Sequence, residues 1–317
     1  MINQELKQLE IVKRFQNEIN EKKEPHTFLF ISGDSFLSYK VMEIFAQALL
    51  CHDLCDECLN CKKLLSSNHP DVMYFPTKNQ LLVEDSNKIS IESFVKPIYA
   101  DKKIFILKDF DKSTEEAQNK LLKIFEEPNE NVYYFLSTTN IEKVLPTIRS
   151  RCFKIQLENL SKEQIEGQII ANCDKPLVLE LGKNNLGKTL EVSRQKDLSE
   201  IVALAKSIFG EMRNSKQVVS YAGKVLAKKE QFALLIEIMT IILEDILLKI
   251  CKKDHLITLQ TQMPFLNNVS QDYSVRSVCE IEKLIRKVEE ERSFNVNLSS
   301  IVDNLLLGIL EVKYICK

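Results

Sequence analysis

The chain has no tryptophan and only seven glycines in 317 residues. Glycine supplies the positive-φ turns that β-rich proteins use, so its scarcity favours a mostly helical chain. The chain also lacks an excess of charge of one sign, because it has 45 acidic residues and 43 Lys and Arg, for a net charge of −2. This balance gives no overall attraction to nucleic acid or to anionic lipid, although it is compatible with a local basic face.

The chain also lacks an apolar run that is free of charge. The longest apolar stretch, FALLIEIMTIILEDILLKI, contains Glu237, Glu244 and Asp245. Three carboxylates are rare in a membrane helix, so we expect a buried core helix here. The first residues, MINQELKQLEIVKRF, are too charged for a secretory signal peptide. We therefore expect a cytoplasmic protein whose nine cysteines are reduced or bound to metal rather than paired as disulfides.

The first 157 residues alternate between β-like runs and helical patterns. The predicted strands are rich in β-branched and aromatic residues: TFLFIS (27–32), DVMYF (71–75), KIFILK (103–108) and VYYFLST (132–138). Between them lie the helical patterns YKVMEIFAQALL, SIESFVKPIYA and STEEAQNKLLKIFEE, of which the last is expected to begin at a Ser113-Thr114 cap and to stop at Pro128. This alternation predicts an α/β domain with a mostly parallel sheet.

The strand patterns disappear after about residue 158. The pattern in residues 161–205 predicts short helices interrupted at Pro176 and around Gly182 and Gly187, and that in residues 206–317 predicts helices almost throughout. Apolar residues recur at helical spacing in 217–228, 231–252, 275–290 and 298–314. The predicted fold class is therefore α/β plus all-α, with an α/β domain (1–157), a small helical domain (158–205) and a helical bundle (206–317).

Four of the nine cysteines lie within eleven residues. In CHDLCDECLNC, Cys51, Cys55, Cys58 and Cys61 are separated by three, two and two residues. Two consecutive C-x-x-C steps bring thiolates onto one ion, so the spacing predicts a closed, structural zinc site at 51–61. His52 in place of one sulfur and a redox C-x-x-C pair are the weaker alternatives. The other cysteines (152, 173, 251, 279 and 316) are expected to be buried small hydrophobes.

The stretch FISGDSFLSYKV has the frame of a phosphate-binding loop without its contacts. An apolar run leads to Gly33, and a helical pattern follows. The pattern G-x-x-x-x-G-K-[ST] needs Gly, Lys and Ser or Thr where this chain has Ser38, Tyr39 and Lys40. Tyr39 cannot supply the cation, and Lys40 cannot supply the hydroxyl ligand of Mg²⁺. A shifted role for Lys40 is disfavoured because one residue turns a helical side chain by about 100°.

Several segments together resemble the bacterial clamp-loader subunits of the AAA+ class, and within that class the delta-prime family of DNA polymerase III. They are HTFLFISGD, the cysteine cluster, NHPDVMYF, NKLLKIFEEP, STTN and SRC, with a weaker match in EERSFNVNLSSIVDNLLL. The resemblance implies an AAA+ domain at 1–157, a helical lid at 158–205 and an oligomerisation collar at 206–317. It also implies a hetero-oligomeric ring with ATPase subunits of the gamma and tau type, a delta subunit, a sliding clamp and primer–template DNA.

The resemblance implies that this chain is the non-catalytic member of such a ring. ATPase subunits of the family end one strand with an acidic pair, whereas here Lys108 stands at the position of the Mg²⁺-binding aspartate and Asp109 at that of the water-activating glutamate. A lysine repels Mg²⁺. With both halves of the site degenerate, we expect no ATP hydrolysis, no ATP in the chain's own site, and a component of DNA polymerase III that is not itself an enzyme.

The resemblance also implies that Arg151, in the SRC motif 150–152, is an arginine finger that acts on ATP held by a neighbouring subunit. Arg149 is the second choice. Thr138, Thr139 and Asn140 stand at the family's sensor-1 position, where we expect them to cap a turn. Lys188 lies near the sensor-2 region but is expected to be a surface lysine.

Two other functions are compatible with the sequence. The first is an ATP-binding loader ATPase with an aberrant loop, which nucleotide binding by the isolated chain would reveal. The second is a zinc-based nucleic-acid adaptor. Lys62 and Lys63 favour it, but nearby acidic residues (Asp53, Asp56, Glu57) offset them, and the cluster lacks a run of aromatic residues for stacking bases. We therefore expect weak DNA binding by the chain alone.

Overall fold

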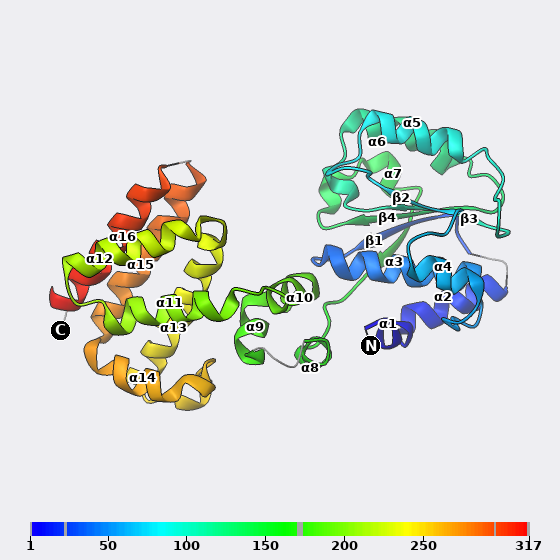
Figure 1. The fold of residues 1–317 in the computed structure, drawn as a ribbon. Coiled ribbons are helices and arrows are strands. Elements are labelled where there is room, and N and C mark those ends of the chain that lie inside the picture. The colour runs from blue at the N-terminus through cyan, green and yellow to red at the C-terminus, as the bar shows by residue number, and fades with distance from the viewer. Residues whose placement is uncertain (1, 22–23, 170–173, 295, 316–317) are drawn as a thin grey trace. The chain divides into compact units, whose positions relative to one another are not determined.

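The computed structural model describes residues 2–21, 24–169, 174–294 and 296–315. It divides into two compact units. One comprises Met1–Gln168 with Asn184–Gly187, and the other Ile169–Lys183 with Lys188–Lys317. The predicted fold class is confirmed, because an α/β unit is followed by a wholly helical one (Figure 1). The three-part domain division proposed from the sequence stays a prediction. Within the described residues, no helix is both long and apolar enough to cross a membrane.

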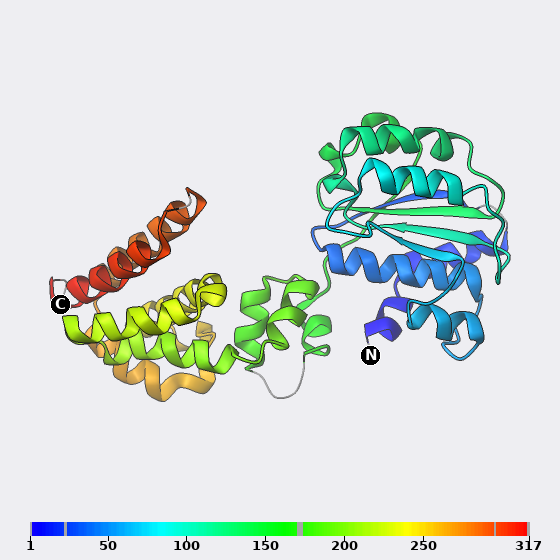
Figure 2. The same cartoon turned by 45° about the horizontal axis from the view of Figure 1, so that its top comes forward.

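The first unit is built on a five-stranded sheet whose order is β2-β3-β4-β1-β5, with every neighbouring pair parallel. Helices cover both faces. Figures 1 and 2 show α3 and α4 on one side of the sheet and α5 and α6 on the other. The strands are β1 (Thr27–Ile31), β2 (Val72–Phe75), β3 (Lys103–Leu107), β4 (Val132–Thr138) and β5 (Phe153–Gln156).

Helices alternate with the strands as predicted, but the helix predicted at 90–100 is wrong: α5 ends at Glu92 and residues 93–100 form turns and irregular backbone. Pro97 has no N–H for a helix, and the N–H groups of the three residues after it bond to the carboxylate of Asp71 instead. Helix α6 begins after the Thr114 cap, whose hydroxyl accepts a hydrogen bond from the backbone N–H of Ala117. The helices are α1 (Ile2–Lys7), α2 (Glu10–Asn20), α3 (Ser35–Leu50), α4 (Leu59–Leu65), α5 (Val83–Glu92), α6 (Glu115–Glu126), α7 (Pro146–Arg149) and α8 (Lys162–Glu166), with short 3₁₀ turns at Phe110–Lys112 and Ile141–Lys143.

Alternation along the strands builds two apolar layers, because successive side chains point to opposite faces of a sheet. On one face, Phe28 and Phe135 pack edge-to-face at 5.5 Å, and Phe15 of α2 stacks on Phe45 of α3 at 4.1 Å. On the other face, Tyr134 packs against Phe125 of α6 at 5.2 Å. The sheet therefore fixes α3 and α6, the two helices that follow the segments in which the sequence predicts a degenerate phosphate loop and a degenerate acidic motif.

The second unit is helical and has one large core. Its longest apolar helix, α13 (Phe232–Ile250), packs in this core as expected. Asp245, which is 1% exposed, accepts hydrogen bonds from the backbone N–H groups of Thr258 and Leu259, both at 2.8 Å. Helix α10 (Leu186–Ser193) begins with two residues of the first unit and continues in the second. The other helices are α9 (Lys175–Gly182), α11 (Leu198–Glu211), α12 (Ser215–Ala227), α13 (Phe232–Ile250), α14 (Met263–Val269), α15 (Val275–Ser293) and α16 (Leu298–Ile315), with 3₁₀ turns at Lys229–Gln231, Asp254–Leu256, Gln260–Gln262 and Ser270–Asp272.

Candidate functional site

The segment with the frame of a phosphate loop forms no loop. Helix α3 begins at Ser35, two residues after Gly33, so Ser38, Tyr39 and Lys40 all lie inside the helix. Asp34 caps it, because its Oδ1 accepts hydrogen bonds from the backbone N–H groups of Phe36 at 3.0 Å and Leu37 at 3.1 Å. These are the N–H groups that a helix offers to an anionic ligand. A carboxylate of the chain itself therefore occupies the anion-binding end of α3.

The second oxygen of Asp34 is also occupied. Oδ2 accepts hydrogen bonds from the backbone N–H groups of Leu186 at 2.6 Å and Gly187 at 3.3 Å, which belong to the same compact unit. Gly187 allows the close approach, because a Cβ there would lie 2.7 Å from the Cβ of Phe36. Asp34 is 2% exposed. Four backbone donors thus converge on one buried carboxylate where a nucleotide site would place phosphate.

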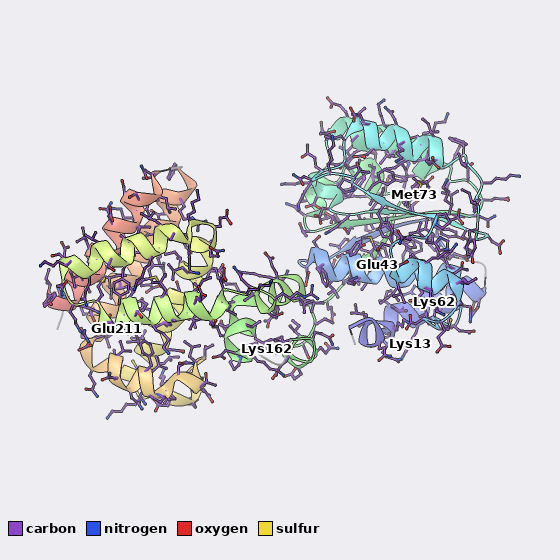
Figure 3. All side chains as sticks on the ribbon, in the orientation of Figure 1. Lys13, Glu43, Lys62, Met73, Lys162 and Glu211 are labelled. Carbon is purple, nitrogen blue, oxygen red and sulfur yellow. The ribbon has the colours of Figure 1, made fainter. Side chains whose placement is uncertain are left out.

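Tyr39 stands where a phosphate-binding lysine would be, and its ring contacts other side chains of this unit. The ring centroid lies 5.4 Å from the Nζ of Lys108 and 6.2 Å from the ring of Tyr74. Both lysines near this ring are within the range of a cation–π contact, since the Nζ of Lys40 lies 5.3 Å from it. Lys40 also pairs with Glu43 at 2.7 Å (Glu43 is labelled in Figure 3).

Asp109, which the resemblance to clamp loaders predicts at the position of a water-activating glutamate, is held in local hydrogen bonds. It accepts one from the hydroxyl of Ser35 and one from Lys112 at 2.9 Å. Burial raises the pKa of Asp109, but these bonds outweigh it and hold the pKa below its usual value. A general base works best with a pKa near the working pH, so Asp109 is poorly suited to activate water.

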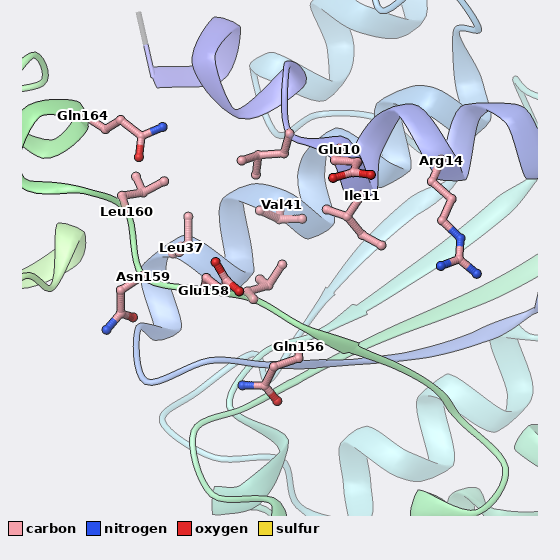
Figure 4. Close-up of a pocket in the computed structure, with 12 residues that line it drawn as sticks. Glu10, Ile11, Arg14, Leu37, Val41, Gln156, Glu158, Asn159, Leu160 and Gln164 are labelled. Atoms are coloured by element: carbon pink, nitrogen blue, oxygen red, sulfur yellow. The ribbon is translucent and has the colours of Figure 1, made fainter.

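A cavity of about 430 Å³ lies beside the same helix (Figure 4). Leu37 and Val41 of α3 form one wall and Ile11 of α2 another, while Gln156 and Leu160 come from the end of β5 and the segment after it. The remaining lining residues are Leu9, Glu10, Arg14, Leu157, Glu158, Asn159 and Gln164. The cavity is thus mixed in character, because α2 contributes charged as well as apolar side chains and the segment after β5 contributes leucines as well as polar ones.

The four clustered cysteines come together as the spacing predicts. The Sγ atoms of Cys51, Cys55, Cys58 and Cys61 all lie within 4.8 Å of one another. Cys51 and Cys55 are 3.6 Å apart at sulfur, and Cys55 and Cys61 are 4.0 Å apart. Four sulfurs at zinc–sulfur bond length around a tetrahedral ion would be about 3.8 Å apart. The donor set and its dimensions therefore fit a structural metal site, and the geometry does not identify the metal.

The thiols of this cluster differ in acidity. Backbone N–H groups, that of Cys58 first, lower the pKa of Cys55 to about 7, whereas burial raises the pKa of Cys61 to about 12. A metal ion deprotonates coordinated thiols and overrides this difference. His52 is turned away from the sulfurs, because its Nε2 lies 2.5 Å from the Oδ1 of Asn20 and its Nδ1 lies 3.3 Å from Asp53.

The expectation of buried cysteines outside the cluster is wrong in part. Cys152 is buried, but Cys251 and Cys279 are exposed. Cys251 is the C-cap of α13, and Cys279 follows buried Val278 on α15, where a turn of about 100° brings it to the solvent side. Cys173 and Cys316 lie outside the described residues.

Arg151 lies in the turn between α7 and β5. Its guanidinium pairs with Glu126 at 2.5 Å and donates to the carbonyl of Thr147 at 2.7 Å, and its side chain is 34% exposed. Arg149 pairs with Glu142 at 3.2 Å, and its side chain is 22% exposed. Both arginines are thus held at the surface of this unit, and Arg151 is the more exposed of the two.

The remaining candidates make local contacts. Thr138 accepts from the backbone N–H of Asn140 at 3.1 Å, Thr139 donates its hydroxyl to Asp111 at 3.0 Å, and Asn140 caps the 3₁₀ turn at Ile141–Lys143. In the second unit, Lys188 pairs with Glu237 at 2.9 Å and is 35% exposed at its side chain. These contacts agree with a turn-capping role and with a surface lysine.

Sequence analysis missed two residues that shape these sites. Asp34 has a local signal, since an aspartate directly before a helical pattern is a common N-cap. Gln47 has none. It is 3% exposed in α3, and its Nε2 donates to the sulfur of Cys61 at 3.1 Å.

Comparison with known proteins shows that the chain is similar to subunits of bacterial DNA polymerase III. A family model described as "DNA polymerase III, delta subunit" matches residues 7–161. The DNA polymerase III subunit delta' of Bacillus subtilis (strain 168) is 24% identical over 322 residues, which cover 95% of each chain. The delta' subunit of Buchnera aphidicola subsp. Schizaphis graminum (strain Sg) is 27% identical over 309 residues, 91% of this chain and 90% of that one.

The tau subunit of Bacillus subtilis (strain 168) is also similar, at 27% identity over 235 residues, 71% of this chain and 38% of its own. The similarity to the two delta' subunits therefore extends over more than nine-tenths of the chain. The resemblance predicted from the motifs is confirmed.

Proposed function

We propose that this chain, a relative of the bacterial delta' subunits, is a non-catalytic subunit of the clamp loader of DNA polymerase III. In this role it braces the loader ring and gives Arg151 to ATP held by a neighbouring subunit of the gamma and tau type. It also contacts the delta subunit that opens the sliding clamp. The chain acts in the cytoplasm as part of a hetero-oligomer, and the assembled complex contacts the sliding clamp and primer–template DNA.

The non-catalytic assignment rests on the N-terminus of α3, whose N–H groups are already bonded to Asp34. Asp34 satisfies the first N–H groups of the helix, and Tyr39 and Lys40 lie within the helix rather than in a loop around a phosphate. A bound triphosphate would have to displace a buried carboxylate from four donors and would find no lysine at the P-loop position. Asp109, already hydrogen-bonded, offers no base for hydrolysis.

The arginine-finger assignment rests on the SRC motif and on the exposure of Arg151. The ion pair with Glu126 lies at the surface, and such pairs contribute about 0–1 kcal/mol. The guanidinium can therefore leave Glu126 for a phosphate at little cost. Arginine fingers accelerate phosphoryl transfer about 10³–10⁵-fold, since they neutralise charge that develops on the γ-phosphate.

We also assign a structural zinc ion to Cys51, Cys55, Cys58 and Cys61. Four thiolates close the coordination sphere and leave no position for a substrate, so the ion supplies folding energy rather than catalysis. The lid role of residues 158–205 and the collar role of residues 206–317 belong to the same proposal and rest on the resemblance to clamp loaders.

The experiment that tests the role in trans is DNA-stimulated ATP turnover by a reconstituted loader that carries Arg151→Ala. We expect the ring to assemble and turnover to fall at least tenfold. Arg149→Ala is the matched control, because it removes a neighbouring surface arginine and is expected to leave the rate within about twofold. An unchanged rate with Arg151→Ala overturns the finger assignment.

The alternative function, an ATP-binding loader subunit with an aberrant loop, is favoured by one observation. The cavity of about 430 Å³ beside α3 is large enough to hold a small planar group between Leu37, Val41 and Ile11. Nucleotide binding by the isolated chain separates the two functions, because the non-catalytic proposal expects none.

A further inference from the structure

The loop that carries the cysteine cluster is tied to both N-terminal helices. Lys7 of α1 donates to the carbonyl of Leu54 at 2.7 Å and pairs with Asp56 at 2.6 Å, where its side chain is 11% exposed. Gln16 of α2 donates to the carbonyl of His52 at 2.9 Å. Helices α1 and α2 both pack against α3. Helices α1 and α2 are therefore bonded to residues 52–56 of the cysteine loop.

A buried glutamine connects this loop to the sulfurs. The Nε2 of Gln47 donates to Asp56 Oδ1 at 2.8 Å and to Cys61 Sγ at 3.1 Å. The other oxygen of Asp56 receives Lys7. A continuous chain of hydrogen bonds thus runs from the most buried cysteine through Gln47 and Asp56 to α1.

The chemistry of a four-cysteine site gives Gln47 a function. Four thiolates around a divalent ion carry two surplus negative charges, and N–H donors to sulfur stabilise them. The backbone N–H groups of Cys58 and Cys61 supply two such donors, to Cys55 at 3.3 Å and to Cys58 at 3.4 Å. Gln47 supplies the third, to the sulfur of Cys61.

The loop itself needs an external constraint. Leu54 and Asp56 have φ angles of 47° and 60°, in the left-handed region that side-chain-bearing residues rarely adopt. Such a conformation persists only where the surrounding structure holds it. Cys51, Cys55 and Cys58 flank these two residues, so a metal that joins the cysteines fixes the ends of the strained segment.

We propose that Gln47 is a second-sphere residue of the metal centre, and that through Asp56 and Lys7 the metal holds α1 and α2 against α3. The inference rests on the zinc site assigned above. Its consequence reaches the cavity of Figure 4, because Leu9, Ile11 and Arg14 at and after the start of α2 line that cavity. Metal occupancy therefore sets the position of one cavity wall.

Hydrogen exchange of the purified full-length chain, with its zinc and after removal by a chelator, tests this inference. We expect zinc removal to accelerate exchange at least tenfold in peptides from residues 2–20 as well as 51–65, while β4 and α6 stay protected. Faster exchange confined to 51–65 overturns the inference and leaves the zinc site standing. If the purified protein contains no zinc, both the inference and the zinc site are overturned.

The variant Gln47→Leu tests the second-sphere role, since it keeps the size of the side chain and removes both donors. We expect zinc affinity to fall about 10–100-fold, the range found for outer-sphere partners, and zinc to pass to a chromophoric chelator correspondingly faster. Gln118→Leu is the matched control, because the side chain of Gln118 is similarly buried and bonds to the backbone of Lys143 and Leu145 rather than to the cysteine cluster. Equal release rates for the two variants overturn the assignment of Gln47, and the exchange experiment decides the inference if Gln47→Leu does not fold.

Discussion

The carboxylate of Asp34 accepts a hydrogen bond from the backbone N–H of Leu186, which lies 152 residues further along the chain, at 2.6 Å. The same side chain caps α3. One buried carboxylate in the turn after β1 thus caps α3 and also binds a distant segment of the same unit. This arrangement supports the proposal that the segment around α3 is a scaffold rather than a nucleotide site.

Replacement of Asp34 is therefore expected to cost stability rather than activity alone. Asp34→Ala removes the cap and leaves four N–H groups without an acceptor, so we expect a loss of about 2–4 kcal/mol in the free energy of unfolding of the first unit. Urea denaturation measures it. Asp53→Ala, at an exposed aspartate, is the control and should change stability by less than about 0.5 kcal/mol. Equal effects would contradict the capping role.

Asp71 makes stability depend on pH in a defined direction. Burial raises the pKa of Asp71, but hydrogen bonds from the backbone N–H groups of Ile98, Ala100 and Tyr99 outweigh it, and the net pKa is lowered. A lowered pKa means that the folded state favours the carboxylate. Its contribution is complete above the unfolded value near 3.8 and is lost as pH falls through the folded pKa.

We expect Asp71→Asn to lose about 1–3 kcal/mol at pH 7, and its stability to fall less steeply than that of the wild type below pH 4. Unfolding by urea at pH 7 and at pH 3 measures both effects. The exposed neighbour Asp101, changed to Asn, should match the wild type at both pH values. If the stability of Asp71→Asn fell with pH as steeply as that of the wild type, other groups would be the cause of the lost stability in acid.

The metal assignment predicts one zinc ion per chain. Cys58→Ser should release it and loosen residues 51–65, because three ligands bind a structural zinc far more weakly than four. Elemental analysis of purified protein measures the content, and proteolysis within 51–65 measures the loosening. Cys279→Ser is the control, since this cysteine is exposed on α15 and should leave zinc in place. A zinc-free wild type would refute the site.

Two glycines of the second unit predict opposite effects on stability. A Cβ at Gly182 would clash with the hydroxyl of Thr189 and lie 3.1 Å from its Cα, so Gly182→Ala should cost about 1–3 kcal/mol. Gly223 lies inside α12 with nothing within 4 Å of an added Cβ, so Gly223→Ala should add about 0.5–1 kcal/mol. Thermal melts compare them, and a stabilising Gly182→Ala would show that α9 and α10 pack differently.

The sequence predicts much of this fold because the signals are local. Four strands carry dense β-branched and aromatic runs, and the structure places each within one residue of its predicted bounds. The fifth, β5 (Phe153–Gln156), was missed because it is short, lies at the sheet edge beside β1, and buries only Ile155. The cysteine cluster could be found for the same reason, since all four ligands lie within eleven residues.

What the sequence does not show depends on distant contacts. The helix α3 begins earlier than the phosphate-loop pattern suggests because Asp34 caps it, and Leu186 joins that carboxylate from far along the chain. Gln47 reaches Cys61 from a neighbouring helix, where no motif marks it. The role proposed for Arg151 would act on another chain, so neither periodicity nor spacing within this one specifies it.

The most direct test of the central claim is a calorimetric titration of the isolated chain with Mg²⁺-ATP. We expect no detectable binding, because Asp34 occupies the N–H groups of α3 and no lysine stands at the phosphate position. Asp34→Asn in the same titration controls for the charge of that carboxylate. Binding to the wild-type chain in the micromolar range would contradict the account and identify the chain as an ATP-binding subunit with a rearranged loop.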